Sequence, residues 1–232
     1  MDSLKKLSRI TGFLYLSLAL IGPFSLMYVP SKIIAAGDLQ ATVNTILTNG
    51  MLFRLGIVGE TLMFLVEIAV VALLYRLFKS VNKPLATIAA FSRLAMTVIQ
   101  GINIMNYLFV LELLNNPTYA KTFETGQLNA LVSLFLKGHE LGNYTWQVFF
   151  GFHLLVLGYL VIKSGYMPKI LGFMVMIGSS GYLIQSYGNF LLPGNTLMLS
   201  AASIGLIFST VGELSFTLWL LIKGVKEPLS KV

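Results

Sequence analysis

Long apolar runs separated by short polar intervals constrain what this chain can fold into more than any other feature. A helix needs about 20 mostly apolar residues to cross a bilayer. Only 11% of the 232 residues are charged, whereas a soluble domain carries roughly a quarter. The chain is therefore predicted to be an all-α polytopic membrane helix bundle that forms a single integral membrane domain over residues 1–232. Six transmembrane helices are expected, at residues 8–29, 53–78, 85–112, 143–163, 168–191 and 197–222.

The distribution of Lys and Arg between these spans predicts their orientation. Cytoplasmic segments of membrane proteins carry an excess of both residues. With the N-terminus inside, the outer segments hold four basic residues, and Arg93 lies within a span. The inner segments hold eleven: Lys5, Lys6, Arg9, Arg76, Lys79, Lys83, Lys163, Lys169, Lys223, Lys226 and Lys231. Both termini are therefore predicted to be cytoplasmic, which places the protein in the cytoplasmic (inner) cell membrane as a multi-pass protein.

Composition and motifs exclude several classes of function. The chain has no cysteine, so it forms neither disulfides nor thiolate metal sites and has no cysteine nucleophile. Its net charge of +7 comes from residues at span ends rather than from a basic patch, so nucleic acid is not expected as a partner. The sequence contains no Walker loop, dinucleotide fingerprint, zincin motif or serine-hydrolase elbow, and no cofactor is expected. A cleavable signal peptide is not expected either, because no small-x-small pattern follows the first apolar run.

Two connections between spans are longer than the others. In the first, Asp38 is predicted to cap a short helix over residues 39–48. The second, residues 113–142, is expected to place His139 in an outer loop just before the fourth span. It also contains an apolar-faced stretch that is expected to lie in the membrane interface, with Leu128, Leu131, Val132 and Phe135.

A short motif recurs at the inner end of three spans. The pattern Lys-[Ser/Gly]-x-x-x-Pro occurs at Lys79–Pro84, Lys163–Pro168 and Lys223–Pro228. Either the preference for inner positive charge and for proline at a helix start produced the three copies independently, or a helix with its turn was duplicated. Inverted transporter repeats would give a different pattern, so the motif does not indicate a transporter.

Four ionisable residues fall at one depth in the predicted bundle. Counted from the inner-end motif, Glu67, His153 and Glu213 lie ten to twelve residues before a lysine, and Arg93 lies nine after a proline. At 1.5 Å per residue, the four positions on four helices agree to within about 5 Å. Since an ionisable group in a span costs a few kcal/mol, the four are expected to face one another. Arg93 is expected to fork to one carboxylate while His153 bonds the other.

This predicted buried polar cluster allows three interpretations. In the first, it is a structural ion-pair network that fixes helix order. In the second, it is a functional cluster that handles protons or recognises a substrate. The third interpretation, metal binding by Glu67, His153 and Glu213, is disfavoured because the Arg93 guanidinium would oppose a divalent cation. No metal site is therefore predicted.

Further polar residues are spaced along helical faces on the outer side of the cluster. They predict a polar cavity that opens outward, with the charged cluster as its floor. Ordinary interhelical hydrogen bonding is the alternative. The residues expected to line the cavity are Glu60, Gln100, Asn103, Tyr107, Trp146, Tyr182, Gln185 and Asn189.

Several stretches resemble an uncharacterised bacterial family of multi-pass membrane proteins, the domain of unknown function numbered 4386. The resemblance extends over essentially the whole chain, and Arg93, His153 and Glu213 fall inside it. It implies a bacterial cytoplasmic-membrane protein with this span pattern and no defined activity or site residues. The matching stretches are 11–16, 37–42 with Asn44, 74–77 through Pro84, 91–93, 150–153 with 158–160, 164–168 with 171–172, and 212–214 with 218–224.

Three functional hypotheses remain open at this point. The first is binding or movement of a small amphiphile or lipid in the outward-opening cavity. The second is an intramembrane enzyme that acts on a lipid or isoprenoid with His153 as acid or base. The third is a structural accessory subunit. The lipid bilayer is the expected surrounding in all three, and the sequence does not indicate an oligomeric state.

Overall fold

A computed structural model describes residues 3–225, in which every regular element is a helix. Within this range, six helical segments are long and apolar enough to cross a membrane: Leu4–Ile33, Gly50–Phe78, Lys83–Asn115, Thr125–Ser164, Lys169–Leu191 and Thr196–Lys223. The prediction of an all-α membrane protein with six spans is confirmed. Lys226, Pro228 and Lys231, which entered the charge count and the third motif, lie outside the described residues. The cytoplasmic position of the termini stays a prediction.

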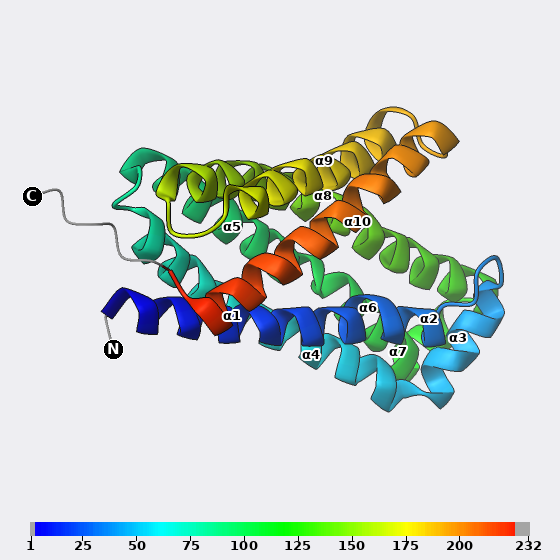
Figure 1. The fold of residues 1–232 in the computed structure, drawn as a ribbon. Coiled ribbons are helices and arrows are strands. Elements are labelled where there is room, and N and C mark those ends of the chain that lie inside the picture. The colour runs from blue at the N-terminus through cyan, green and yellow to red at the C-terminus, as the bar shows by residue number, and fades with distance from the viewer. Residues whose placement is uncertain (1–2, 226–232) are drawn as a thin grey trace, which may run out of the picture. The chain divides into compact units, whose positions relative to one another are not determined.

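The helices follow one another with short connections (Figure 1). The first span is continuous but contains a π-helical segment, η1, which starts at a proline. Proline has no N–H for the α-helical ladder, which accounts for a local change of helix type. The elements are α1 (Ser3–Gly22), η1 (Pro23–Tyr28), α2 (Val29–Ile33), α3 (Leu39–Thr48), α4 (Gly50–Phe78), α5 (Lys83–Asn103), α6 (Met105–Asn115), α7 (Pro117–Thr122), α8 (Thr125–Ser164), α9 (Lys169–Leu191), α10 (Thr196–Leu218) and η2 (Trp219–Lys223).

These elements divide into two compact units, and several long helices contribute to both. Unit 1 comprises the described parts of Met1–Ala19 and Tyr144–Val232, together with Val66–Thr97. Unit 2 comprises Leu20–Leu65 and Val98–Asn143. That the chain acts as one integral domain stays a prediction.

Glycines set the close helix packing in unit 1. The helices α9 and α10 lie side by side (Figure 1), and a Cβ atom on Gly205 would lie 2.5 Å from the Cα atom of Gly181. In the same way, a Cβ atom on Gly12 would lie 2.6 Å from the backbone nitrogen of Leu221. Small residues allow such close approach between membrane helices, where van der Waals packing drives association.

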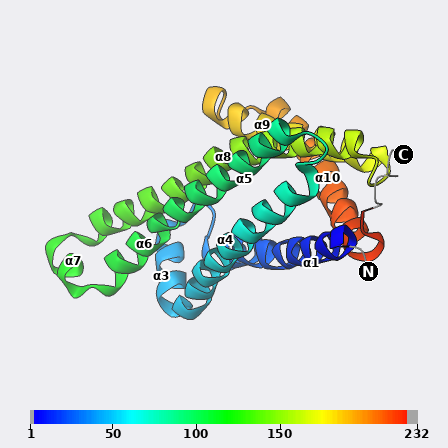
Figure 2. The same ribbon diagram turned by 90° about the vertical axis from the view of Figure 1, so that its left-hand side faces the viewer.

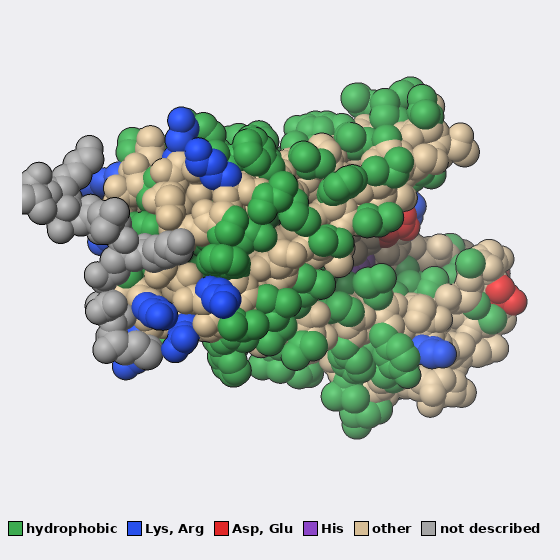
Figure 3. All heavy atoms as spheres, in the orientation of Figure 1, with side chains coloured by type: hydrophobic (Ala, Val, Ile, Leu, Met, Phe, Trp, Pro, Cys, Tyr) green, Lys and Arg blue, Asp and Glu red, His purple; other side chains and the backbone are tan. Residues whose placement is uncertain are grey.

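Two of the inner-end motifs meet in unit 1. The hydroxyl groups of Ser80 and Tyr166 lie 3.0 Å apart, and the ring of Tyr166 packs 6.1 Å from that of Phe78. In Figure 3, Lys and Arg side chains gather at one end of the visible face, beside a surface of hydrophobic side chains. The motif therefore marks helix ends that lie together, and both explanations of its origin stay open.

Unit 2 has a hydrophobic core between the end of the first span, α3, α4, α6 and the start of α8. The predicted helix over residues 39–48 is confirmed, and Asp38 caps it by accepting a hydrogen bond of 2.8 Å from the Ala41 N–H. Figure 2 shows α6 and the first part of α8 running alongside each other, joined through α7. The buried core residues are Val29, Ile33, Val43, Ile46, Phe53, Tyr107, Val110, Leu111, Leu113 and Val132.

The helix that contains the fourth span is longer than predicted, and the stretch expected to lie in the membrane interface packs inside unit 2. Helix α8 begins at Thr125 rather than at residue 143 and runs unbroken for 40 residues. The stretch Leu128, Leu131, Val132 and Phe135 packs into the core of unit 2, where Val132 is fully buried, because its apolar face meets α6. His139 consequently lies within a helix and is 2% exposed, rather than in an outer loop.

Candidate functional site

Arg93 on α5 is the centre of a buried polar cluster in unit 1. Its guanidinium forks to Glu67 of α4: Nε donates to Oε2 over 2.5 Å and Nη2 donates to Oε1 over 3.1 Å. The third nitrogen, Nη1, donates to the Tyr15 hydroxyl at 2.9 Å and lies 3.1 Å from Nε2 of His153. The arginine is 1% exposed. A bidentate pair of this kind neutralises the charge in a region without solvent.

His153 on α8 is held by the backbone and by Arg93. Its Nδ1 lies 2.8 Å from the carbonyl oxygen of Ala89, which can only accept a hydrogen bond. Nδ1 therefore carries the hydrogen, and Nε2 accepts from Arg93. The predicted hydrogen bond between His153 and a carboxylate is wrong, because Glu67 is occupied by the arginine fork and Glu213 has other donors.

Glu213 on α10 is surrounded by hydroxyl groups. Oε1 accepts a hydrogen bond of 2.8 Å from Ser209 and one of 3.5 Å from Tyr182. Oε2 accepts from the Tyr15 hydroxyl at 3.2 Å. The carboxylate is thus connected to Arg93 through Tyr15, which lies between them.

The structure brings the four predicted residues together, and Tyr15 is the member that sequence reasoning missed. A signal for it existed in the same depth count. Tyr15 lies nine residues after Lys6, just as Arg93 lies nine after Pro84. Its ring also faces the guanidinium, whose carbon is 4.5 Å from the ring centroid. The Arg93 cluster is hereafter Tyr15, Glu67, Arg93, His153 and Glu213.

Within residues 3–225, the void beside His153 is too small for a substrate. The void beside His153 holds about 10 Å³, and its walls are mostly alanine and leucine. The ring of Phe150 covers the guanidinium at 5.3 Å. A ligand site needs a cavity of about 300 Å³ or more. Chemically, the arrangement therefore joins helices α1, α4, α5, α8 and α10 within unit 1.

A second buried polar group lies in unit 2, around Glu60 on α4. Its Oε2 atom accepts a hydrogen bond of 2.8 Å from Gln100 and lies 3.3 Å from Nε2 of His139. Asn103 donates to the carbonyl oxygen of His139 at 2.9 Å. The imidazole of His139 stacks on the ring of Tyr107, with centroids 3.6 Å apart and planes inclined by 13°. These five residues are hereafter the Glu60 cluster.

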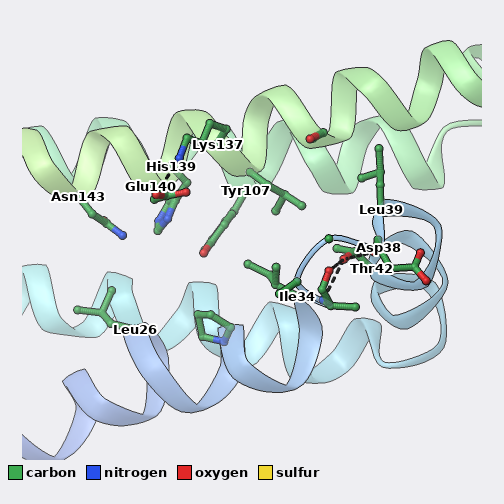
Figure 4. A pocket seen from close by; sticks show the side chains of 16 residues that line it. Leu26, Ile34, Asp38, Leu39, Thr42, Tyr107, Lys137, His139, Glu140 and Asn143 are labelled. Atoms are coloured by element: carbon green, nitrogen blue, oxygen red, sulfur yellow. Dashed lines mark hydrogen bonds and ion pairs between the residues drawn. The ribbon is translucent and has the colours of Figure 1, made fainter. Parts of the chain in front are cut away.

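The Glu60 cluster borders a cavity of about 500 Å³, to which it contributes Tyr107 and His139. Figure 4 shows Tyr107, His139 and Asn143 pointing from α6 and α8 toward Leu26 and Ile34 on the opposite side. The polar groups of Tyr107, His139 and Asn143 therefore face the apolar side chains of Leu26 and Ile34 across the cavity. The full lining is Leu26, Pro30, Ile34, Ala35, Ala36, Gly37, Asp38, Leu39, Thr42, Tyr107, Ser133, Leu136, Lys137, His139, Glu140 and Asn143.

The residues predicted to line one cavity have different surroundings in the structure. Tyr107 lines the cavity of unit 2, and Glu60, Gln100 and Asn103 are buried behind its wall. The other four belong to unit 1. Among them, Trp146 and Tyr182 are packed ring against ring, whereas Gln185 and Asn189 border a narrow hollow with no space for a water-sized ligand.

His139 is the cavity residue that the sequence analysis missed. It was assigned to an outer loop just before the fourth span, although Gly138 and Gly142 beside it lie within helix α8. In the structure these glycines make room for the side chains of Asn106 and Asn103, which approach where a Cβ atom would stand. Two glycines four residues apart, matched by two asparagines elsewhere in the chain, would have been the signal that this stretch is helical and packed. In residues 3–225, no three His, Asp or Glu side chains are grouped so that they could hold a metal ion.

The fold and its two buried polar clusters define a polytopic α-helical membrane protein. Residues 10–224 match the family model described as "Domain of unknown function (DUF4386)", and the chain belongs to this family. It is also 32% identical, over 175 residues, to an uncharacterized protein of Archaeoglobus fulgidus. That similarity covers 73% of this chain and 84% of the archaeal protein. No solved structure matches the chain.

Proposed function

We propose that this protein binds a small amphiphile, such as a single-chain lipid, in the cavity of unit 2. The observation that carries the proposal is the two-sided lining of this cavity. Its volume of about 500 Å³ lies in the range of small-molecule sites, about 300–1,000 Å³. Polar groups on one wall and apolar side chains on the other match the two ends of an amphiphile.

The apolar wall would receive the chain of the ligand. Leu26 and Pro30 come from the first span, and Ile34 directly follows it. The polar wall carries the Tyr107 ring edge and the His139 imidazole, both on buried residues. Burial of apolar area drives binding, while a few polar groups fix the orientation of the ligand.

The charge distribution of the chain predicts the side of the membrane toward which the cavity opens. With both termini in the cytoplasm, the connection that contains Asp38 and the α6–α8 connection lie outside. The cavity, lined by Asp38 and Lys137, then opens toward the outer side of a bacterial cytoplasmic membrane. The Arg93 cluster serves in this proposal to hold the helices of unit 1 together.

An intramembrane enzyme with His153 as acid or base is not favoured by any observation. Both ring nitrogens of His153 have partners in the chain, and the adjacent void holds about 10 Å³. A general acid or base must reach the proton that it transfers.

The proposal is tested by photolabelling in phosphatidylcholine nanodiscs. Single-chain amphiphiles with a diazirine in the chain would label the lining segments 26–42 and 133–143, located by peptide mass spectrometry. The Ala36→Trp substitution fills the cavity mouth from an exposed position and should reduce labelling about tenfold or more. Ala120→Trp, at an exposed position of α7 outside the lining, is the matched control and should label as the wild type. Equal labelling of all three proteins would refute the proposal.

A further inference from the structure

The hydrogen-bond pattern of the Glu60 cluster fixes which nitrogen of His139 carries a hydrogen. An ionised carboxylate can only accept hydrogen bonds. Since Oε2 of Glu60 lies 3.3 Å from Nε2 of His139, this nitrogen is the donor. In the tautomer that carries its hydrogen on Nε2, Nδ1 is an acceptor. Among residues 3–225, the structure gives Nδ1 no partner, and His139 lines the cavity.

The Tyr107 hydroxyl is a second polar group that the protein leaves for a ligand. The ring is fixed between Phe53, at 4.9 Å between centroids, and His139. Figure 4 shows the hydroxyl oxygen pointing into the cavity. In the described part of the chain it forms no hydrogen bond. A phenol both donates and accepts, so the wall offers one acceptor and one group of either kind.

The charges around the cavity disfavour an anionic ligand. Lys137 is the one Lys or Arg among the described lining residues, and it pairs with Glu140 at 2.8 Å. Asp38 adds a negative charge at the mouth, and Glu60 adds another behind His139. A phosphate or carboxylate would thus gain no free cation and would approach two carboxylates.

We infer that the ligand is a single-chain alcohol, whose neutral hydroxyl group donates to Nδ1 of His139 and accepts from the Tyr107 hydroxyl. The inference rests on the proposed function, since it names the ligand class of the same cavity. Glu60 is a positioning residue in this arrangement, because it sets the tautomer of His139. Gln100 in turn holds the carboxylate of Glu60.

Three probes of equal chain length, each with a diazirine, test the ligand class in phosphatidylcholine nanodiscs. They are a ten-carbon primary alcohol, its methyl ether and its phosphate monoester, compared by the concentration that gives half-maximal labelling. The alcohol should bind best, and the ether, which cannot donate to Nδ1, should bind about three- to tenfold more weakly. The phosphate should be weaker than the ether.

A matched pair of tyrosine variants completes the test. Tyr107→Phe keeps the stacked ring and should weaken binding of the alcohol and of the ether about three- to tenfold each, because both ligand oxygens accept from the Tyr107 hydroxyl. Tyr119→Phe removes a hydroxyl group outside the lining and should leave both unchanged. Phosphate binding as tight as alcohol binding or tighter would overturn the inference, and so would a Tyr107→Phe variant that binds the alcohol as the wild type does. Either result would leave the proposal of amphiphile binding intact. Labelling by all three probes that Ala36→Trp does not reduce would refute the proposed function itself.

Discussion

Arg93 has all three guanidinium nitrogens within 3.1 Å of partners in Glu67, Tyr15 and His153. An isolated arginine at this position in a span would cost several kcal/mol. Here the charge is neutralised by the fork to Glu67, and the tyrosine and histidine accept from Nη1. The individual side chain is therefore stable only as part of the cluster.

Removal of one partner from this cluster should destabilise the protein. Arg93→Met leaves Glu67 buried without its donor and should lower the free energy of unfolding by about 3–5 kcal/mol. Thermal unfolding of the purified protein measures the change. The double variant Arg93→Met, Glu67→Leu removes both charges and should recover most of the loss. A double variant less stable than Arg93→Met would contradict the ion-pair account.

At the scale of a helix, α8 shows how small residues make room for the polar partners of a buried side chain. Gly142 lies where the amide of Asn103 enters, and Asn103 donates to the backbone carbonyl of His139. Gly126 of the same helix has no atom within 4 Å of the position that a Cβ would take. The two glycines therefore have different roles although both lie in a helix.

This contrast predicts opposite effects of the same substitution. Gly142→Ala forces the Asn103 amide to move and should destabilise the protein by about 1–3 kcal/mol. It should also weaken alcohol binding, because the backbone beside His139 shifts. Gly126→Ala should be neutral or stabilise by up to about 1 kcal/mol, since alanine is the better helix former. Unfolding and photolabelling of both variants measure this, and equal stability of the two would argue against the packing role of Gly142.

For the whole molecule, orientation in the membrane decides which compartment the ligand comes from. The chain has no cysteine, so single cysteines can be introduced without background. Lys121→Cys should react with a membrane-impermeant maleimide in intact cells, whereas Lys79→Cys should react only after the cells are lysed. The two positions are exposed at opposite predicted sides. The reverse pattern would invert the topology and place the cavity mouth inside.

The whole fold could be predicted from sequence to the extent that it depends on long apolar runs and local caps. The six spans and the Asp38 cap are of this kind. The extent of α8 could not be predicted, because its glycines are compensated by asparagines on other helices. Tertiary contacts thus override the local signal, and they also moved His139 from a loop into a buried site.

The two polar clusters also differ in how much of each could be predicted from the sequence. Depth counting brought Glu67, Arg93, His153 and Glu213 to one level, because helix rise is constant. It could not determine hydrogen-bond partners, since these depend on helix rotation and on side-chain reach. For this reason the cavity residues were assigned to one pocket, although their side chains have different surroundings.

The most direct test of amphiphile binding is to identify what the protein carries from the cell membrane. The wild type, Ala36→Trp and Ala120→Trp would be extracted with a styrene–maleic acid polymer, without detergent, and their bound lipids quantified by mass spectrometry. We predict a neutral single-chain alcohol at about one molecule per chain in the wild type and in Ala120→Trp, and about tenfold less in Ala36→Trp. The same lipid composition in all three proteins would contradict the account.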